Sequence, residues 1–351
     1  MTTEIIKAYL PNGEIDKIAI KKAAEIIKEG GLVVMPTETV YGLGGDGTNP
    51  NAASKIYAAK GRPSDNPLII HIATPSDAEK YAYTSEVYYK IAEEFMPGPI
   101  TVVLDAKPSV PKETRGGLDT VAVRCPSNRV ANLLIDYSGV PIAAPSANLS
   151  GSPSPTSLEH VIDDMNGRVD AIIDGGNSEI GLESTIVKIN TDNTLTLLRP
   201  GKVTLGELMS VAPVSVADAV VNKLDDNAKA ISPGMKYRHY APTAPLYLLD
   251  GSASNALSYI KDKKQGRVAV ICYSEDIDSF RSHLFGCDVY EFGSRSDEAR
   301  QAYLLFSILR DTDKKDYDVI YAPLPEKTGM GLALYNRMIR AAAHQIITLG
   351  W

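Results

Sequence analysis

The sequence has few cysteines, histidines, tryptophans and phenylalanines. Its 351 residues include 3 cysteines, 5 histidines, 1 tryptophan and 5 phenylalanines. Cys125, Cys272 and Cys287 stand far apart and form no CxxC pair. This excludes a disulfide framework and a thiolate zinc site, and it favours a reducing compartment, so we expect a cytoplasmic protein.

Long apolar runs and an excess of positive charge are also missing. The first residues, MTTEIIKAYLPNGE, lack an apolar signal segment, and no stretch approaches the ~18 apolar residues of a membrane helix. Lysine and arginine total 36 against 43 acidic residues, which gives a net charge of −7. We therefore expect no membrane association, and any anionic ligand needs a local basic cluster.

Several common catalytic motifs do not occur, namely GxSxG, HExxH and the GxxxxGK[ST] phosphate loop. The stretch from Gly42 to Gly47, GLGGDG, formally matches the GxGxxG dinucleotide fingerprint. That fingerprint leaves a strand and opens a helix directly. Here PTETVY separates it from the preceding strand and Thr48-Asn49-Pro50 from the next helix, so we reject a dinucleotide site at this position.

Segments with strand and helix character alternate along the chain. Apolar spacing predicts helices over 14–30, 51–60, 85–95 and 130–137. The segments LVVMP, PLIIHI, ITVVLDA, TVAVRCP, VPIAAPSAN, VDAIIDGG, STIVKI and TLTLLRPG have the composition of strands. From residue 246 a second alternation begins, with strands at PLYLLD, RVAVICY, CDVYEF and YDVIYAP and helices over 254–264, 276–284 and 297–310.

This pattern predicts two α/β domains. The first is a larger mixed α/β domain over 1–208, and the second is a small doubly wound domain over 244–351 with a parallel sheet covered by helices. The connection over 209–243 carries the dense motif SPGMKYRHYAPTAP. Long connections are typically lids or linkers, and the basic, aromatic KYRHY cluster favours a lid that closes on an anion.

One basic segment, KGRPSDNPLIIH, places Lys60, Arg62, Asn66 and His71 close together in the sequence. A glycine and two prolines suggest a rigid loop that aims both cations the same way, and a guanidinium beside an ammonium suits phosphate or carboxylate oxygens. A solvated surface pair is the alternative. His71 taken alone is typical of a core histidine.

Two polar loops follow predicted strands. In PTETVYGLG, three hydroxyls (Thr37, Thr39 and Tyr41) lie just beyond a strand end, where α/β sheets place ligand-binding loops, although local capping explains them equally well. In APSANLSGSPSPT, Ser146 and Asn148 alternate and would face one way in an extended chain, and a flexible loop is the alternative. A site rich in Lys, Arg, Ser, Thr and Asn without an evident nucleophile suits nucleotidyl transfer, because positioning and charge neutralisation supply most of its rate.

The order of these motifs, with MPGPITVVL, GLESTIV, LRPG and SPGMKYRHYAP, resembles the threonylcarbamoyl-AMP synthase family in its longer, two-domain form. The resemblance is dense over residues 14–208 and continues through PGMKYRHYAP. It implies a twisted α/β sheet with a basic cavity, plus a smaller Rossmann-like domain. The implied reaction converts L-threonine, bicarbonate or CO2 and ATP into L-threonylcarbamoyl-AMP and diphosphate, for tRNA threonylcarbamoyladenosine modification next to the anticodon.

The resemblance also implies roles for single residues. The KxR and SxN motifs fall on the catalytic tetrad Lys60, Arg62, Ser146 and Asn148. Threonine would be bound by Thr37, His71, Arg124, Ala144 (through its backbone) and Ser184. ATP would be bound by Arg62, Asn66, Thr120, Ser146, Ser154, Arg199 and Tyr237. No metal site on the protein is implied, and Mg2+ is expected on the ATP phosphates.

Implied partners are the downstream tRNA threonylcarbamoyl transferase complex and, weakly, tRNA. Two alternatives to the synthase differ from it in sequence features. A hydrogenase-maturation carbamoyltransferase would bring an acylphosphatase module and cysteine-rich zinc fingers, which three isolated cysteines do not support. An RNA-binding, translation-associated module is disfavoured by the negative charge and by the presence of only one tryptophan and five phenylalanines.

Overall fold

In the computed structural model, residues 2–222 and 240–350 are described. These residues form two compact units. The first consists of residues 2–150 and 154–222, and the second of residues 151–153 and 240–350. The three-residue segment 151–153 therefore belongs by its contacts to the second unit although its neighbours in sequence belong to the first.

The first unit is built on a mixed sheet of eleven strands in the order β1-β8-β2-β3-β7-β4-β6-β5-β9-β10-β11. Parallel pairs such as β4 with β6 occur beside antiparallel pairs such as β5 with β6. The strands are β1 (Glu4–Lys7), β2 (Val33–Met35), β3 (Gly42–Asp46), β4 (Ile69–His71), β5 (Ile100–Asp105), β6 (Thr120–Arg124), β7 (Ile142–Ala143), β8 (Ala171–Asp174), β9 (Thr185–Ile189), β10 (Leu195–Arg199) and β11 (Val214–Val216).

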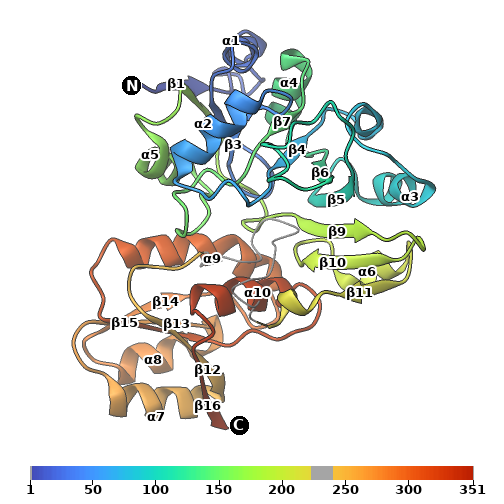
Figure 1. Cartoon of the computed structure of the whole chain (residues 1–351). Coiled ribbons are helices and arrows are strands. Elements are labelled where there is room, and N and C mark those ends of the chain that lie inside the picture. Colours follow the sequence, from blue (N-terminus) through green and yellow to red (C-terminus); the bar gives the residue numbers. More distant parts are fainter. Residues whose placement is uncertain (1, 223–239, 351) are drawn as a thin grey trace. The chain divides into compact units, whose positions relative to one another are not determined.

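Helices α1 and α4 pack together on this sheet (Figure 1). The Asp16 carboxylate starts α1 by accepting bonds from the backbone N–H groups of Ile18 and Ala19. The apolar sides of both helices, including Ile20 and Leu134, bury against the strands in one core. The helices of this unit are α1 (Lys17–Lys28), α2 (Pro50–Lys60), α3 (Glu86–Phe95), α4 (Arg129–Ser138), α5 (Leu158–Met165) and α6 (Leu205–Met209), with short 3-10 turns η1 (Pro75–Lys80) and η2 (Asp218–Val220).

The GLGGD stretch is strand β3, which confirms the rejection of a dinucleotide fingerprint there. Helix α2 packs directly on this strand at Gly45. A Cβ atom added to Gly45 would lie 3.3 Å from the Ile56 side chain and 3.4 Å from that of Ala52. Gly45 thus allows close packing between helix and sheet, and Gly44 allows close packing against Ile142 of β7. Strand β1 and helix α5 were missed, since EIIK is very short and LEHVIDDM directly follows a Ser/Pro loop.

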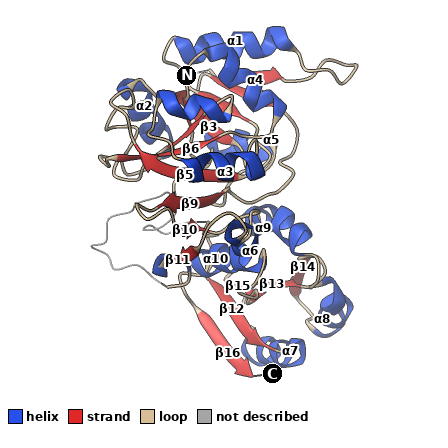
Figure 2. Ribbon diagram, turned by 90° about the vertical axis from the view of Figure 1, so that its right-hand side faces the viewer, coloured by secondary structure: helices blue, strands red, loops and turns tan. Residues whose placement is uncertain are grey.

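The second unit has a five-stranded, all-parallel sheet in the order β14-β13-β15-β12-β16. Helices α7 and α8 cover one face and α9 and α10 the other (Figures 1 and 2), which confirms the expected parallel sheet with helices on both faces. Its elements are β12 (Leu246–Gly251), α7 (Ala253–Lys263), β13 (Val268–Cys272), η3 (Ser274–Asp276), α8 (Ile277–His283), β14 (Cys287–Glu291), α9 (Glu298–Asp313), β15 (Val319–Pro323), α10 (Gly331–Ala341) and β16 (Ile346–Gly350).

Helix α10 and strand β16 were not predicted. Helix α10 buries the polar Asn336 and Arg337 together with its apolar residues, which obscures its amphipathic pattern. Within the described residues, no helix combines the length and the apolar composition that crossing a membrane requires.

Candidate functional site

The resemblance predicts a catalytic tetrad, and three of its members, Lys60, Ser146 and Asn148, lie in contact at the end of α2. Lys60 is the last residue of this helix, and Gly61 stops it with a left-handed backbone of φ 63°. Lys60 is only 2% exposed, and its Nζ donates to the carbonyl oxygens of Ser146 and Asn148, the latter at 2.6 Å. The hydroxyl of Ser146 donates to Oδ1 of Asn148 at 2.5 Å. The alternation of Ser146 and Asn148 thus predicted their proximity, and a buried cation lies against both.

Arg62 makes different contacts. Its Nη2 donates to the carbonyl of Pro67 at 3.2 Å, and its Nε lies 3.4 Å from the carbonyl of Asn66. Lys60 and Arg62 thus contact different carbonyl groups, and a common orientation of the two cations stays a prediction. The Arg62 guanidinium bonds carbonyl groups of its own short loop, whereas the Lys60 ammonium bonds the loop at 146–148.

Asn66 carries a polar atom that the described protein leaves unsatisfied. The residue is 1% exposed, and its side-chain Oδ1 has no hydrogen-bond partner among the described residues. Buried side-chain oxygens are usually paired, so an unpaired one in a basic loop is a candidate ligand contact. The ATP contact that the resemblance implies for Asn66 stays a prediction.

Strands β4 and β6 present predicted site residues on one face of the sheet. His71 and Arg124 are register partners at the ends of these parallel strands. Thr120 begins β6 four residues earlier and shares the face of Arg124, because side chains alternate along a strand. Between them lies an apolar floor in which Ile69 and Ala122 pack with residues of neighbouring strands.

Arg124 is paired with an acid that was not predicted to be in the site. Its Nη2 lies 2.7 Å from Oε1 of Glu38, and both side chains are about 95% buried or more. Burial raises the pKa of Glu38, but the charge and hydrogen bond of Arg124 outweigh this effect, so the pKa lies below its ordinary value. Nε of Arg124 is buried without a hydrogen-bond partner in the described chain, which leaves a donor for an anionic ligand.

His71 is a neutral imidazole within this group. Burial, followed by the positive charge of Arg124, lowers the pKa of His71 to about 3. Its Nδ1 lies 3.2 Å from the carbonyl oxygen of Ile142 on β7. A neutral ring beside a guanidinium can orient a ligand without adding a second positive charge.

The PTETVY loop folds back on itself through its first two hydroxyls. Oγ1 of Thr37 donates to the carbonyl of Val40 at 2.5 Å and lies 2.8 Å from Oγ1 of Thr39. Tyr41 does not join them, because its hydroxyl donates to the carbonyl of Gly176 at 2.6 Å. The expected trio of hydroxyls is therefore a pair, with Tyr41 turned to the end of β8.

A third polar group lies where β5, β9 and β10 meet. The Ser184 hydroxyl lies 2.7 Å from that of Thr101 and accepts a bond from Nη2 of Arg199 at 3.1 Å. Nε of Arg199 donates to the Ser184 carbonyl at 3.0 Å. The two residues that the resemblance assigns separately to threonine and to ATP are thus in direct contact.

Three other predicted site residues remain, two within the described residues and one outside them. Ala144 uses its backbone N–H in a 2.9 Å bond to the carbonyl of Ile69. Ser154 is fully buried, and its hydroxyl donates to the carboxylate of Glu183. Tyr237 lies outside the described residues, as does the PGMKYRH part of the expected lid.

Three polar residues in contact with the site were missed by sequence reasoning, namely Glu38, Thr101 and Glu183. For two of them the sequence itself contains a local indication of a polar role. Glu38 is the acid of PTETVY, and Thr101 is the single hydroxyl residue inside the apolar strand ITVVL. Their importance depends on partners 83 to 86 positions away in the sequence, which a local pattern does not reveal.

The site contains cations, amides and hydroxyls but offers little nucleophilic chemistry. Cys125 is a buried thiol, and burial raises its pKa to about 12. Among residues 2–222 and 240–350, no group of three or more His, Cys, Asp or Glu side chains could hold a metal ion. Buried cations with hydroxyl and amide donors can bind anions and reduce repulsion between them.

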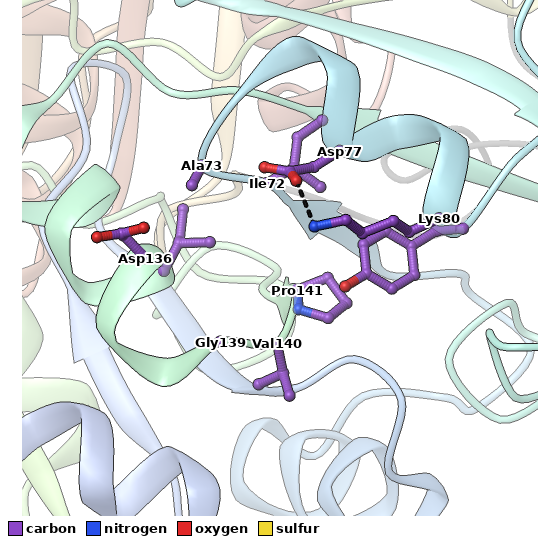
Figure 3. Close-up of a pocket in the computed structure, with 10 residues that line it drawn as sticks. Ile72, Ala73, Asp77, Lys80, Asp136, Gly139, Val140 and Pro141 are labelled. Carbon is purple, nitrogen blue, oxygen red and sulfur yellow. Dashed lines mark hydrogen bonds and ion pairs between the residues drawn. The ribbon is translucent and has the colours of Figure 1, made fainter.

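A separate hollow opens on the first unit and does not include these residues. It is lined by Ile72, Ala73, Asp77, Lys80, Tyr81, Ile135, Asp136, Gly139, Val140 and Pro141 (Figure 3). The ion pair drawn there joins Lys80 and Asp77 at 2.7 Å, three residues apart in the sequence. The Lys80 side chain is 67% exposed, so this is a screened surface pair and we assign no ligand to it.

Two protein families match the chain, one in each part. The family described as "Telomere recombination" matches residues 25–201. The family described as "Threonylcarbamoyl-AMP synthase, C-terminal domain" matches residues 203–343.

Full-length relatives match almost the whole chain. The threonylcarbamoyl-AMP synthase of Pyrococcus abyssi (strain GE5 / Orsay) is 43% identical over 340 residues, covering 95% of this chain and 96% of that protein. The threonylcarbamoyl-AMP synthase of Bacillus subtilis (strain 168) is 44% identical over 335 residues, covering 93% and 94%. The crystal structure of P. abyssi Sua5 complexed with L-threonine is 41% identical, covers 99% of both chains and superimposes with a TM-score of 0.88.

Proposed function

Since this chain belongs to the family of threonylcarbamoyl-AMP synthases, we propose that the group around Lys60, Ser146 and Asn148 is its reaction centre. The chain is an L-threonylcarbamoyladenylate synthase, which joins L-threonine, bicarbonate or CO2 and ATP into L-threonylcarbamoyl-AMP and releases diphosphate. Its product serves the threonylcarbamoyladenosine modification of tRNA next to the anticodon. The observation that supports this centre is the buried Lys60 ammonium against the 146–148 loop.

We assign the amino acid to the face of β4 and β6. The unsatisfied Nε of Arg124 is the natural donor for the threonine carboxylate, and Glu38 fixes the other edge of that guanidinium. Thr37, His71, the backbone of Ala144 and Ser184 complete the proposed threonine site. The neutral state of His71 leaves Arg124 as the cation facing the carboxylate.

We assign ATP to Arg62, Asn66, Thr120, Ser146, Ser154 and Arg199, with Tyr237 as a further predicted contact. Threonine's amine adds CO2 and loses a proton, and a carbamate oxygen then attacks the α-phosphorus while the bond to the leaving diphosphate breaks. Two anions must approach each other in this step, and the charges of Lys60 and Arg62 reduce their repulsion. No side chain becomes covalently modified in this mechanism.

Other parts of the proposal rest on chemistry or on the sequence alone. Mg2+ enters as part of the MgATP substrate and is held by its phosphates. The catalytic domain is assigned to residues 1–208, the connection to 209–243 and the small domain to 244–351. The cytoplasmic location, weak tRNA binding and transfer of the product to the tRNA threonylcarbamoyl transferase complex stay predictions.

The test is diphosphate release from ATP, with bicarbonate present, across the twenty amino acids. We expect release that requires threonine and that falls about a hundredfold or more in Lys60→Ala, because a buried charge at the reacting phosphate is lost. Arg62→Ala should also lose activity. Lys55→Ala is the matched control, since Lys55 lies on the same helix and donates to the carbonyl of Gly30.

Each other outcome has a distinct meaning. Release without selectivity for threonine would indicate a different carbamoyl adenylate chemistry. No release, together with salt-dependent RNA binding, would favour an RNA-binding module. A covalent threonyl or adenylyl adduct seen by intact-mass measurement would contradict the direct attack.

A further inference from the structure

Thr101 on β5 shares a face of the first unit's sheet with the proposed threonine site. Val103, two residues further along β5, is the register partner of Ala122 on β6. Arg124 follows Ala122 by two residues. Because side chains alternate along a strand, Thr101 and Arg124 lie on this same face.

Ser184 joins this face from the next strand of the sheet, since β5 lies between β6 and β9. It directly precedes β9, and Ile186, two positions later, packs in one apolar cluster with Val103. The hydroxyl of Ser184 lies 2.7 Å from that of Thr101, and both residues are fully buried. Thr101 thus contacts a residue that we assign to threonine binding.

The hydroxyl oxygen of Ser184 accepts two hydrogen bonds from the protein. Nη2 of Arg199 lies 3.1 Å away, and a guanidinium can only donate. Within the described part of the chain, the hydroxyl of Thr101 has that of Ser184 as its one hydrogen-bond partner. A buried hydroxyl proton without an acceptor is costly, so Thr101 donates its proton to Ser184.

This assignment of donors determines what Ser184 offers to a ligand. A hydroxyl group has two lone pairs and one proton, and Arg199 and Thr101 occupy both lone pairs. The proton of Ser184 is then left for a third group. The serine therefore presents a donor, which suits an oxygen atom of the amino acid and does not suit its ammonium group.

We propose that Thr101 is a positioning residue for threonine, which keeps the Ser184 hydroxyl as a hydrogen-bond donor to an oxygen of the amino acid. This inference rests on the proposed function for the identity of the ligand. Without the Thr101 hydroxyl, Ser184 gains a free lone pair and loses its fixed orientation, so threonine binding should weaken. The described bond of Thr101 goes to Ser184 and not to an ATP contact, so ATP binding should stay unchanged.

The experiment compares Thr101→Val, Thr101→Ser and the control Thr185→Val in the full-length protein. Valine keeps the β-branched shape that suits a strand and removes the hydroxyl. Thr185 is also fully buried, and its hydroxyl donates to the carbonyl of Val203 at 2.7 Å. We expect Thr101→Val to raise the Kd and KM for threonine about three- to tenfold, the effect of one hydrogen bond, and the KM for ATP less than about twofold. Thr101→Ser keeps the donor, so this variant and Thr185→Val should bind threonine as the wild type does.

A double-mutant cycle tests whether Thr101 acts through Ser184. In a Ser184→Ala background, Thr101→Val should change threonine binding no further, because the partner of its hydroxyl is already gone. An effect that adds in full to that of Ser184→Ala would overturn the proposal. Equal changes in the KM for both substrates in Thr101→Val would do so as well, since they would indicate a general structural loss.

Equilibrium dialysis with L-threonine separates this inference from the proposed function. A wild type that binds threonine but releases no diphosphate would refute the proposed function, and the Kd values of the variants would still decide the role of Thr101. Diphosphate release with an unchanged Kd for threonine in Thr101→Val would refute the role of Thr101 alone. A wild type that binds no threonine would refute both.

Discussion

The first unit and the α7–α8 side of the second unit differ in what they bury against a sheet. The face of β4 and β6 in the first unit buries His71 and Arg124 beside its small apolar floor. The sheet side under α7 and α8 buries Val268, Val270 and other apolar residues in one core. Burying charge costs free energy unless it is paired, so the first arrangement needs a compensating partner such as Glu38, and the second needs none.

This difference indicates that the β4–β6 face carries polar groups which lower stability and serve binding or catalysis. Buried side chains that break a local pattern concentrate at functional sites, whereas regular apolar alternation serves stability. The two faces should therefore respond differently to substitution and to pH.

The largest stability effect is expected from Glu38→Ala. The substitution leaves the Arg124 guanidinium buried without its acidic partner, which typically costs about 3–5 kcal/mol. Denaturant unfolding at pH 7 measures the loss. Asp276→Ala is the control in the second unit, because its partner Arg295 is 46% exposed and the pair should contribute little. A loss for Glu38→Ala no larger than for the control would remove the distinction between the two faces.

The pH dependence of stability should come next in size. The pKa of His71 is about 3 in the folded state, below its ordinary value of 6.5, so the unfolded state binds more protons between these values. His71 therefore makes the free energy of unfolding fall as the pH falls, by about 1.4 kcal/mol per pH unit at most. The depressed pKa of Glu38 adds its own loss only below its ordinary value of 4.5.

Unfolding measured between pH 6 and pH 5 thus separates the effect of His71 from that of Glu38. We expect His71→Asn to flatten the slope in this window, and His283→Asn, an exposed histidine of the second unit, to leave it as in the wild type. Identical slopes for all three proteins would show that His71 is not kept neutral by folding.

The smallest effect should come from the apolar side of the second unit. Ile260 is fully buried on α7, and Ile260→Val removes one methylene at a typical cost of about 0.5–1.5 kcal/mol. We expect this loss in denaturant unfolding together with an unchanged rate of diphosphate release under folding conditions. A changed KM for either substrate would mean that this core is coupled to the site.

Sequence reasoning predicted the repetitive parts of the fold better than its irregular parts. The helix expected over 51–60 is Pro50–Lys60, and the strand in TVAVRCP is Thr120–Arg124. Strand β3 was missed because glycines give no apolar alternation, although Gly45 is required by the packing of α2. Helix α10 was missed because it buries Asn336 and Arg337, whose partners no local pattern displays.

The sequence by itself determined the α/β alternation, the family and the positions of Lys60, Arg62, Ser146 and Asn148, because these are carried by local spacing and by motif order. Only the tertiary structure decided which groups meet. It paired Glu38 with Arg124, turned Tyr41 away from the Thr37 hydroxyl and placed Gly151–Pro153 in the second unit. Such contacts join residues tens to more than a hundred positions apart, and they follow from strand order and helix packing, which spacing along the chain does not encode.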